Sequence, residues 1–351
     1  MDTLTITRPD DWHLHLRDGR CLADAVHWSA ARFSRAIVMP NLTPPVTTTE
    51  AARAYRARIL AARPAGSDFE PLMTLYLTDN TPPSEIERAA ASGIIQAVKL
   101  YPAGATTNSD AGVTDIRCCD EALAAIAEHG LTLCIHGEVT HPDTDIFDRE
   151  AVFLDERLDP LIARHPDLRI VMEHLTTARA VDYVRAGPER LGATLTPQHL
   201  LMNRNDLLVG GIRPHHYCLP ILKRERDREA LLEAATSGHP RFFLGTDSAP
   251  HPQHAKETPC GCAGIFSAPA AIEFYAEAFE QAGALDRLEG FASHFGADFY
   301  GLPRNRGTLT LTRRARTLPD TLPYAGDAIV PLRAGAAVDW SIHPTPATES
   351  P

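Results

Sequence analysis

Histidines, a lysine and an aspartate stand at or near the ends of short apolar runs throughout the 351-residue chain. In chain order, these residues and one asparagine are His13, His15, Asn41, Lys99, His136, His174, His199 and Asp247. His13 and His15 are two residues apart, which places both imidazoles on one face of a β-strand. Imidazole nitrogens and carboxylate oxygens are common ligands of Zn²⁺. The pattern therefore predicts a metal centre whose protein ligands include His13, His15, His136, His174 and Asp247.

Lysine is rare in this chain. Only 3 of the 34 basic residues are lysines, which leaves 31 arginines. Lys223 opens the segment KRERDRE, which is typical of a solvated helix face, whereas Lys99 lies in the apolar run AVKLYP. A buried lysine can become a neutral, nucleophilic amine, which arginine cannot. If Lys99 takes up CO₂, its carbamate has two oxygens that can bridge two metal ions. The alternative is a lysine whose ammonium reaches solvent at the rim of the site.

The elements that must position these residues are alternating strands and helices. Eight runs have the character of strands: TITRPDDWHLHL, RAIVMPN, PLMTLYL, AVKLYP, LTLCIHGE, RIVMEHL, GATLTPQHL and RFFLGTDSAP. Helical patterns between them cover 49–62, 84–92, 119–129, 151–164, 178–186 and 225–235. This alternation predicts an α/β fold with a parallel sheet, and eight units favour one closed (β/α)8 TIM barrel. An open doubly wound sheet is the alternative, but no strand is followed by Gly-x-Gly-x-x-Gly.

The pattern changes after Asp247. Residues 264–300 are predicted to be helical, and LTLTRRARTL is predicted to form an edge strand with its arginines exposed. The closing HPTPATESP is rich in proline and polar residues, which predicts disorder. We therefore expect one barrel domain over residues 1–351, with a C-terminal extension from about residue 301 and a disordered tail over 343–351.

Composition argues against several classes of protein. The net charge of −11 argues against a binder of nucleic-acid backbones. No apolar run approaches the ~20 residues that cross a membrane, and the N-terminal MDTLTITRPDD has no apolar signal-peptide core. The odd number of cysteines, 7, indicates reduced thiols, and Cys260 and Cys262 are expected to be small buried hydrophobic residues rather than a metal clip. We expect a cytoplasmic protein without membrane or nucleic-acid partners.

Seven segments carry a more specific signal when they are taken together. They are DDWHLHLRDG, VMPNLTPP, VKLYPAGATTNS, IHGEV, MEHLTT, TPQHL and GTDSAPH. In this order the chain resembles the amidohydrolase superfamily, and within it the dihydroorotase family of the shorter bacterial and yeast type, over residues 5–342. The resemblance implies a metal-dependent barrel that cyclises N-carbamoyl-L-aspartate reversibly to L-dihydroorotate in pyrimidine biosynthesis. It also implies a homodimer.

The same resemblance implies a cofactor of two Zn²⁺ ions per subunit. Lys99, as N6-carboxylysine, and a hydroxide would bridge the ions. His13, His15 and Asp247 would join Lys99 at one ion, and His136 and His174 would join it at the other. Asp247 would also be the catalytic acid and base, because it would take the hydroxide proton and deliver it to the leaving ring nitrogen.

A cationic pocket must bind the anionic substrate. Arg17 follows His15 by two residues and can bind a carboxylate with a bidentate fork. The resemblance implies a larger substrate-binding set, namely His15, Arg17, Asn41, Thr106, Thr107, His136, Leu219, His251 and Ala263. The two threonines lie in AGATTNSDAG, whose small polar residues suit a mobile lid. The alternatives are an ordinary surface loop and, for Asn41, a plain turn residue.

Other polar residues are not assigned to the site. His199 is expected in a packing role, and His215 and His216 are expected in a loop near the substrate. Glu138 and Glu173 flank ligand histidines, and strand alternation is expected to turn Glu173 away. Ser248 has no base beside it, and the chain lacks Gly-x-Ser-x-Gly, which argues against a serine hydrolase. Two functional alternatives stay open: another cyclic amidase, such as a hydantoinase or dihydropyrimidinase, and a non-catalytic scaffold barrel.

Overall fold

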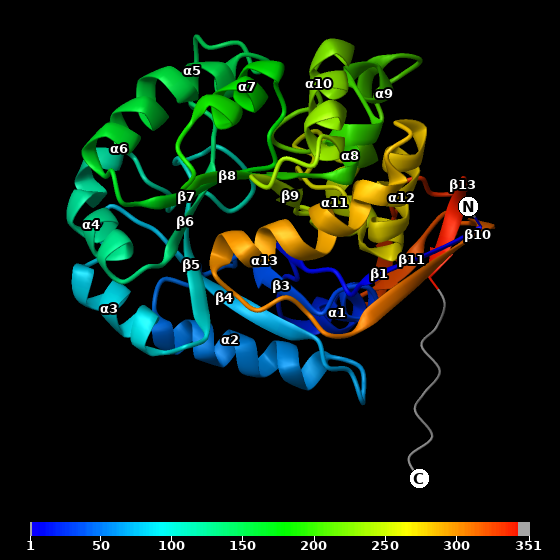
Figure 1. The fold of residues 1–351 in the computed structure, drawn as a ribbon, viewed down its shortest axis with the longest axis horizontal. Helices are drawn as coiled ribbons and strands as arrows, with labels where there is room; N and C mark the ends of the chain where they lie inside the picture. Colours follow the sequence, from blue (N-terminus) through cyan, green and yellow to red (C-terminus); the bar gives the residue numbers. More distant parts are fainter. Residues whose placement is uncertain (1, 343–351) are drawn as a thin grey trace.

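Eight parallel strands form the centre of the fold in the computed structural model, which describes residues 2–342 (Figure 1). The tail predicted to be disordered, 343–351, lies outside the described residues. The strands pair in chain order, and they are β2 (Asp11–Leu14), β3 (Arg35–Val38), β4 (Glu70–Tyr76), β5 (Ile95–Leu100), β6 (Thr132–His136), β7 (Arg169–Glu173), β8 (Leu191–Leu195) and β9 (Phe242–Leu244). The ring closes where the Asp247 N–H donates to the His13 carbonyl at 2.9 Å and the His15 N–H donates to the Ser248 carbonyl at 3.1 Å. The predicted barrel is therefore confirmed.

Helices surround these strands (Figure 1). They are α1 (Leu22–Ala30), α2 (Thr49–Ala62), α3 (Pro83–Ala91), α4 (Asp120–Glu128), α5 (Arg149–Phe153), α6 (Asp159–Arg164), α7 (Ala178–Ala186), α8 (Pro197–Leu201), α9 (Arg204–Leu208), α10 (Glu225–Thr236), α11 (Gln253–Lys256), α12 (Ala271–Gln281) and α13 (Phe295–Tyr300). The bounds of α2 and α7 are those predicted. Helix α2 begins where the Thr48 hydroxyl accepts the Ala51 N–H, and it buries Ala52, Tyr55 and Ile59 on one face.

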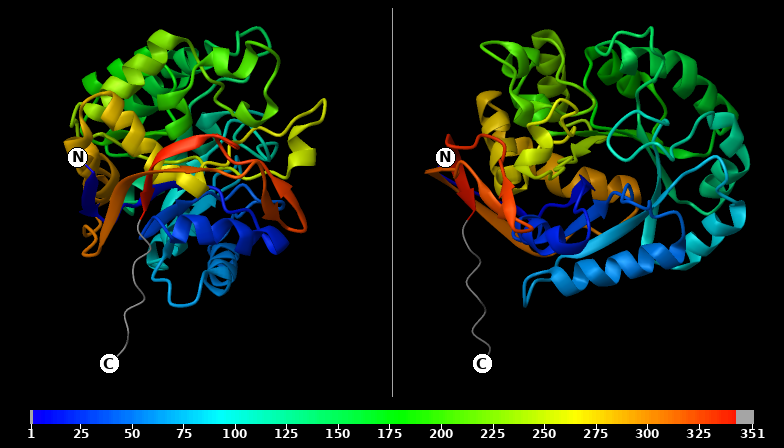
Figure 2. Two further views of the ribbon diagram at one scale, coloured as in Figure 1. Left: turned by 90° about the vertical axis from the view of Figure 1, so that its right-hand side faces the viewer. Right: turned by 180° about the vertical axis from the view of Figure 1, so that it is seen from behind.

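A second, antiparallel sheet contains the first and the last strand of the described residues (Figure 2). It consists of β1 (Thr3–Thr7), β10 (Thr308–Thr317) and β13 (Ala337–Ile342), with a separate hairpin of β11 (Leu322–Tyr324) and β12 (Asp327–Ile329). Two predictions are wrong here. The run TITRPDDWHLHL forms two strands in different sheets, because Pro9 lacks the N–H that would continue the ladder. The strand β10 is also not an edge strand, since it lies between β1 and β13.

The inside of the barrel is filled by two layers of side chains. We call the first the lower layer, and it consists of Ile37, Leu72, Ala97, Cys134, Val171 and Phe243. Helix α13 covers this layer, and its Tyr300 ring stacks on Trp12 at a centroid distance of 4.6 Å. Two residues farther along β5, β6 and β7 stand Lys99, His136 and Glu173. With His13, His174 and Asp247, these residues form the upper layer.

Within residues 2–342, no helix is both long enough and apolar enough to cross a membrane.

Candidate active site

The first histidine–aspartate cluster joins the two strands that close the barrel. The His13 and His15 Nε2 atoms are 3.1 Å apart, and Asp247 Oδ1 lies 3.3 Å from the first and 3.1 Å from the second. All three side chains are buried. Burial lowers the pKa of both histidines, so their imidazoles are neutral at pH 7 and their nitrogens are free to bind a cation. This cluster is the predicted first metal site.

Two of the groups predicted for the second metal site, His136 and His174, line the same cavity as the first cluster, and Lys99 is buried nearby. The His136 and His174 rings have centroids 4.8 Å apart. The Lys99 ammonium contacts Glu173, and His136 Nε2 lies 2.8 Å from Glu138 Oε2. The structure thus brings the three predicted ligands together, with a glutamate beside two of them.

The prediction that Glu173 turns away from the site is wrong. Its carboxylate contacts Lys99, and its Oε1 lies 3.3 Å from His13 Nδ1. Val171 points into the barrel, so Glu173 does the same two residues later. His174 enters the site for a different reason, because it follows the end of β7 with a left-handed φ of 45°. Sequence reasoning therefore missed both Glu173 and Glu138.

Lys99 is entirely buried. The alternative that its ammonium reaches solvent is therefore wrong. Its Nζ lies 4.7 Å from the centre of the Tyr101 ring, and burial lowers the pKa of this lysine to about 7. A lowered pKa means that an appreciable share of the side chain is a neutral amine near neutral pH. Only the neutral amine has the lone pair that reacts with CO₂, so the environment suits the predicted carbamate.

The donor atoms of the upper layer suit a metal ion. Among the described residues, His13 Nδ1, His174 Nδ1 and Glu173 Oε1 are buried and have no hydrogen-bond partner. Buried polar atoms are normally satisfied, and neutral imidazole nitrogens with carboxylate oxygens are the set that Zn²⁺ prefers. Two groups of potential ligand atoms lie close enough to hold an ion: His13, His15 and Asp247, and His13, Glu173 and His174.

The predicted carboxylate-binding residues are adjacent to this cluster. Arg17 donates from Nε to the Pro250 carbonyl at 3.1 Å, and its Nη2 lies 2.8 Å from His251 Nε2. Burial and the charge of Arg17 lower the pKa of His251 to about 2, so Arg17 carries the positive charge of this pair. Asn41 Oδ1 lies 2.9 Å from His15 Nδ1, which connects Asn41 to the cluster of His13, His15 and Asp247.

Three site residues have left-handed backbone conformations. The φ values are 60° at Arg17, 45° at His174 and 46° at Asp247. Residues other than glycine adopt this conformation at an energetic cost, and such residues concentrate at functional sites. Each of these three residues follows a barrel strand. Its left-handed backbone turns the side chain toward the site, a direction that the alternation of side chains along the strand would not predict.

The predicted lid lies over the cavity. Thr107 Oγ1 donates to the Ala263 carbonyl at 3.3 Å, and Asn41 Nδ2 donates to the Thr107 carbonyl at 3.1 Å. Thr106, Leu219 and Ala263 line the same cavity, whose volume is about 20 Å³. That volume accommodates about one water molecule. The loop that contains Thr106 and Thr107 therefore forms part of the wall of this cavity.

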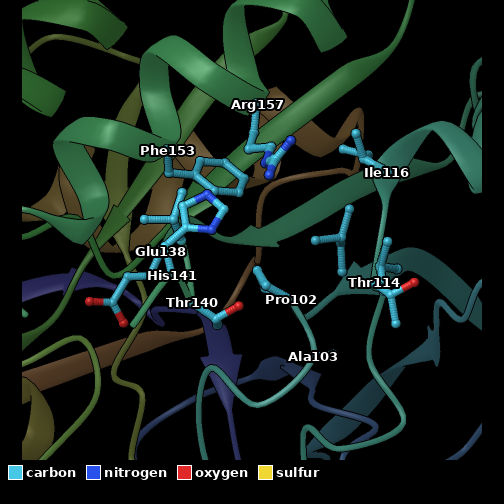
Figure 3. Close-up of a pocket in the computed structure, with 12 residues that line it drawn as sticks. Pro102, Ala103, Thr114, Ile116, Glu138, Thr140, His141, Phe153 and Arg157 are labelled. Atoms are coloured by element: carbon cyan, nitrogen blue, oxygen red, sulfur yellow. The ribbon is translucent and has the colours of Figure 1, made fainter. Parts of the chain in front are cut away.

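A larger cavity of about 300 Å³ lies beside the lid (Figure 3). Its walls include Pro102, Thr114, His141, Phe153 and Arg157. The described residues that line this cavity do not include the predicted ligand histidines or Arg17. Glu138 lines it and also contacts His136, so it is the one described lining residue that connects this cavity to the predicted metal ligands. The candidate catalytic groups therefore meet in the smaller of these two cavities.

Several residues outside the site can also be compared with their predictions. His199 packs as predicted, with Nε2 3.0 Å from the Pro220 carbonyl. Lys223 is buried and donates to the Ile221 carbonyl at 3.1 Å, so its predicted place on a solvated helix face is wrong. Helix α10 begins only at Glu225. The cysteines are free thiols, as predicted, but the expectation that Cys260 and Cys262 are buried is wrong, because Cys260 is exposed and Cys262 is partly exposed.

The fold and the site together define a metal-dependent barrel hydrolase, and comparison with known families agrees. The sequence model described as "Amidohydrolase family" matches residues 7–316. The chain therefore belongs to the amidohydrolase family.

Similar proteins define its branch of that family. The dihydroorotase of Alkalilimnicola ehrlichii is 70% identical, with 97% of this chain and 100% of the relative covered. The dihydroorotase of Laribacter hongkongensis is 65% identical, with 97% and 99% covered. The crystal structure of Saccharomyces cerevisiae dihydroorotase in complex with 5-fluoroorotic acid has a TM-score of 0.90 and 32% identity, with 98% and 99% covered. Within the amidohydrolases, this chain is one of the dihydroorotases.

The hydantoinase alternative is only a distant relationship. L-hydantoinase from Arthrobacter aurescens has a TM-score of 0.79 and 15% identity, with 97% of this chain and 83% of that chain covered. At this identity the likeness shows a shared fold and nothing finer.

Proposed function

We propose that this enzyme cyclises N-carbamoyl-L-aspartate reversibly to L-dihydroorotate, a step of pyrimidine biosynthesis. One observation carries the proposal: a single cavity is lined by the histidine–aspartate cluster, by Arg17 and by the loop that contains Thr106 and Thr107. Dihydroorotate is a cyclic amide that bears a carboxylate. An enzyme that opens this ring therefore needs one group of residues that activates the amide and a cation, at a fixed distance from it, that binds the carboxylate. The yeast relative was solved with 5-fluoroorotic acid, a carboxylated pyrimidine.

The upper layer would hold two Zn²⁺ ions. His13, His15 and Asp247 would bind one ion and His136 and His174 the other, with Lys99, carboxylated on Nζ, shared between them. When bound, two such ions lower the pKa of water and polarise the amide carbonyl. Carboxylation reverses the charge of Lys99, so its contact with Glu173 would be lost and the lysine would be free to face the metal side.

Asp247 is the proposed acid and base. Its buried carboxylate lines the cavity and lies beside His13 and His15. In ring opening, Asp247 takes the proton of the attacking water and gives it to the leaving ring nitrogen. In cyclisation, it removes a proton from the ureido nitrogen of N-carbamoyl-L-aspartate. Groups in this role contribute about 10²–10⁴-fold to rate.

Arg17, Asn41 and His251 would bind the substrate carboxylate. The overall charge of −11 repels an anion, so a local cation must oppose the field of the whole protein. The backbone groups of Leu219 and Ala263 would hold the ring edge, and Thr106 and Thr107 would close over it. Closure excludes water and completes the hydrogen bonds to the ring.

The proposal extends to the assembly and its location. We expect a homodimer in the cytoplasm, as the family resemblance implies, without nucleic-acid or membrane partners. Size-exclusion chromatography coupled to light scattering should then give a mass twice that of the 38.3 kDa chain.

The first test is ring opening of L-dihydroorotate by zinc-loaded protein, followed by ultraviolet absorbance, with 5,6-dihydrouracil as the comparison substrate. We expect opening of dihydroorotate alone, with two zinc ions bound per chain. If only dihydrouracil were opened, the proposed metal centre would stand, and dihydroorotate would be ruled out as the substrate. If protein with two bound zinc ions opened neither ring, the proposed substrate pocket would be wrong.

A further inference from the structure

Lys256, the third lysine of this arginine-rich chain, is buried at the end of α11. Its side chain has 4% relative exposure, although α11 is a helix of only four residues in a loop segment near the site. Burial lowers the pKa of Lys256 to about 8, which shows that its charge is held in a poorly solvated position. A buried charge persists only where polar partners compensate for lost water. The partners of this ammonium therefore indicate what it does.

The ammonium donates to three backbone carbonyls. These belong to Tyr217 at 3.0 Å, Cys262 at 2.9 Å and Gly264 at 2.5 Å. A lysine ammonium has three N–H groups, so every donor is used. Tyr217 lies 39 residues earlier in the chain than Lys256. The ammonium therefore ties two distant segments to one point, and the Gly264 N–H adds a direct link by donating to the Tyr217 carbonyl at 3.0 Å.

These carbonyls flank the two backbone positions assigned above to the substrate ring. Ala263 lies between Cys262 and Gly264, and Leu219 lies two residues after Tyr217. Both Ala263 and Leu219 line the small cavity of the site. The Ala263 carbonyl also accepts from Thr107 Oγ1 at 3.3 Å and lies 3.1 Å from His251 Nε2. One buried cation thus fixes the peptide on which the lid, the carboxylate clamp and the ring edge converge.

We propose that Lys256 is a positioning residue for substrate binding, acting through the backbone of Leu219 and Ala263. The inference rests on the proposed function and adds to it the residue that sets the ring-edge geometry. An arginine would not serve, because its guanidinium spreads five N–H groups in one plane, whereas these three carbonyls converge on a single nitrogen. This geometry explains why lysine is retained here in a chain that otherwise uses arginine.

The test compares Lys256→Met and Lys256→Arg with the zinc-loaded wild-type enzyme. We measure kcat and KM for dihydroorotate, the Kd for 5-fluoroorotate, bound zinc and the melting temperature. Arg32→Met is the control for the loss of a buried cation. Arg32 is also buried, and it donates to the Pro269 carbonyl at 2.5 Å and to both carboxylate oxygens of Glu273 on α12, but it does not line the small cavity. Its removal reports the general effect of losing a buried cation.

A positioning role predicts that Lys256→Met raises KM and the Kd for 5-fluoroorotate by at least about tenfold, the scale of one charged hydrogen bond. We expect kcat to fall less than KM rises, bound zinc to stay at the wild-type level, and Lys256→Arg to show the same defect. Arg32→Met should lower the melting temperature and leave both KM and Kd near the wild-type values.

Two results would overturn the inference: unchanged KM and Kd in Lys256→Met, or full recovery in Lys256→Arg. If Lys256→Met does not fold, Lys256→Arg decides the question through the same constants. Failure of the proposed function has a different signature, because the wild-type enzyme itself would then open no dihydroorotate.

Discussion

The two layers inside the barrel have opposite chemistry although the same strands supply them. Strands β5, β6 and β7 contribute Ala97, Cys134 and Val171 to the lower layer. Two residues farther on, about 6.6 Å along each strand, they contribute the ionisable residues of the upper layer. On these three strands the backbone is regular in both layers, so there the difference lies in the side chains, whereas His174 and Asp247 enter the upper layer through left-handed turns after their strands. A barrel therefore separates stability from chemistry by position along its axis.

The two layers also contribute differently to the stability of the folded state: burial of the lower layer is favourable, and burial of the charged groups of the upper layer is unfavourable. The lower layer packs apolar side chains around Phe243, which makes edge contacts with Trp12 at 6.4 Å and Tyr300 at 6.3 Å between ring centroids. Burial of such groups stabilises the fold. The upper layer buries Lys99 and Glu173, whose desolvation is unfavourable and is offset in part by their mutual contact. The comparison predicts that changes in one layer should affect stability and changes in the other should affect activity.

The largest effect should follow from Lys99→Arg in the upper layer. The substitution keeps a positive charge, but a guanidinium cannot take up CO₂ to form a carbamate. We expect kcat to fall by more than about 10³-fold, because a metal centre contributes several kcal/mol to catalysis. Ring opening and zinc content are the measurements. Near-normal turnover would refute the bridging role of Lys99 and, with it, the division of labour between the layers.

Phe243→Ala tests the lower layer. Truncation of a buried aromatic side chain should lower the free energy of unfolding by about 3–4 kcal/mol, measured by denaturant titration of the metal-free protein. Zinc binding and KM of the folded enzyme should stay at wild-type values. Ile212→Ala is the control, since Ile212 is 79% exposed and should change stability by less than about 0.5 kcal/mol. A loss of zinc in Phe243→Ala would show that the layers are coupled.

The barrel was predictable because its signals are local and repeated. Each of the eight runs combines apolar residues with a polar residue near its end, and the His13–His15 spacing is itself a strand signature. The bounds of α2 were equally readable, since Thr48 is a good cap and the apolar positions follow the helical period. Most features that depend on one strand or one helix were therefore recovered from the sequence, although the first run proved to be two strands.

Features that depend on backbone turns or distant partners were not predictable. Glu173 was excluded by counting alternation from His174, whose left-handed φ cannot be read from the residue type. Lys223 was assigned to a charged helix face, but helix α10 begins two residues later and the lysine turns inward. The middle position of β10 depends on pairing with β1, about 300 residues away. The first two errors come from local backbone conformation that residue types do not reveal, and the third comes from a long-range strand pairing.

Arg17→Met tests the substrate-binding residues at the rim of the barrel, outside both layers. Loss of a charged contact to the substrate carboxylate should raise KM for dihydroorotate by about ten- to a hundredfold. Zinc content should be unchanged, because Arg17 contacts Pro250 and His251 rather than the ligand cluster. Steady-state kinetics and metal analysis on the same sample provide both numbers. A variant that loses zinc would place Arg17 in the metal layer instead.

The smallest effect should come from the lid, which sits above both layers. Thr107→Val removes the hydroxyl that donates to the Ala263 carbonyl and keeps the shape of the side chain. We expect kcat/KM to fall by about fivefold, the scale of one neutral hydrogen bond, without a change in stability. Thr114→Val is the matched control, since its hydroxyl donates to Asp79 at 2.6 Å near the foot of the loop. If both variants lost activity equally, the loop would act through its general order, and the hydroxyl of Thr107 would have no specific role at the site.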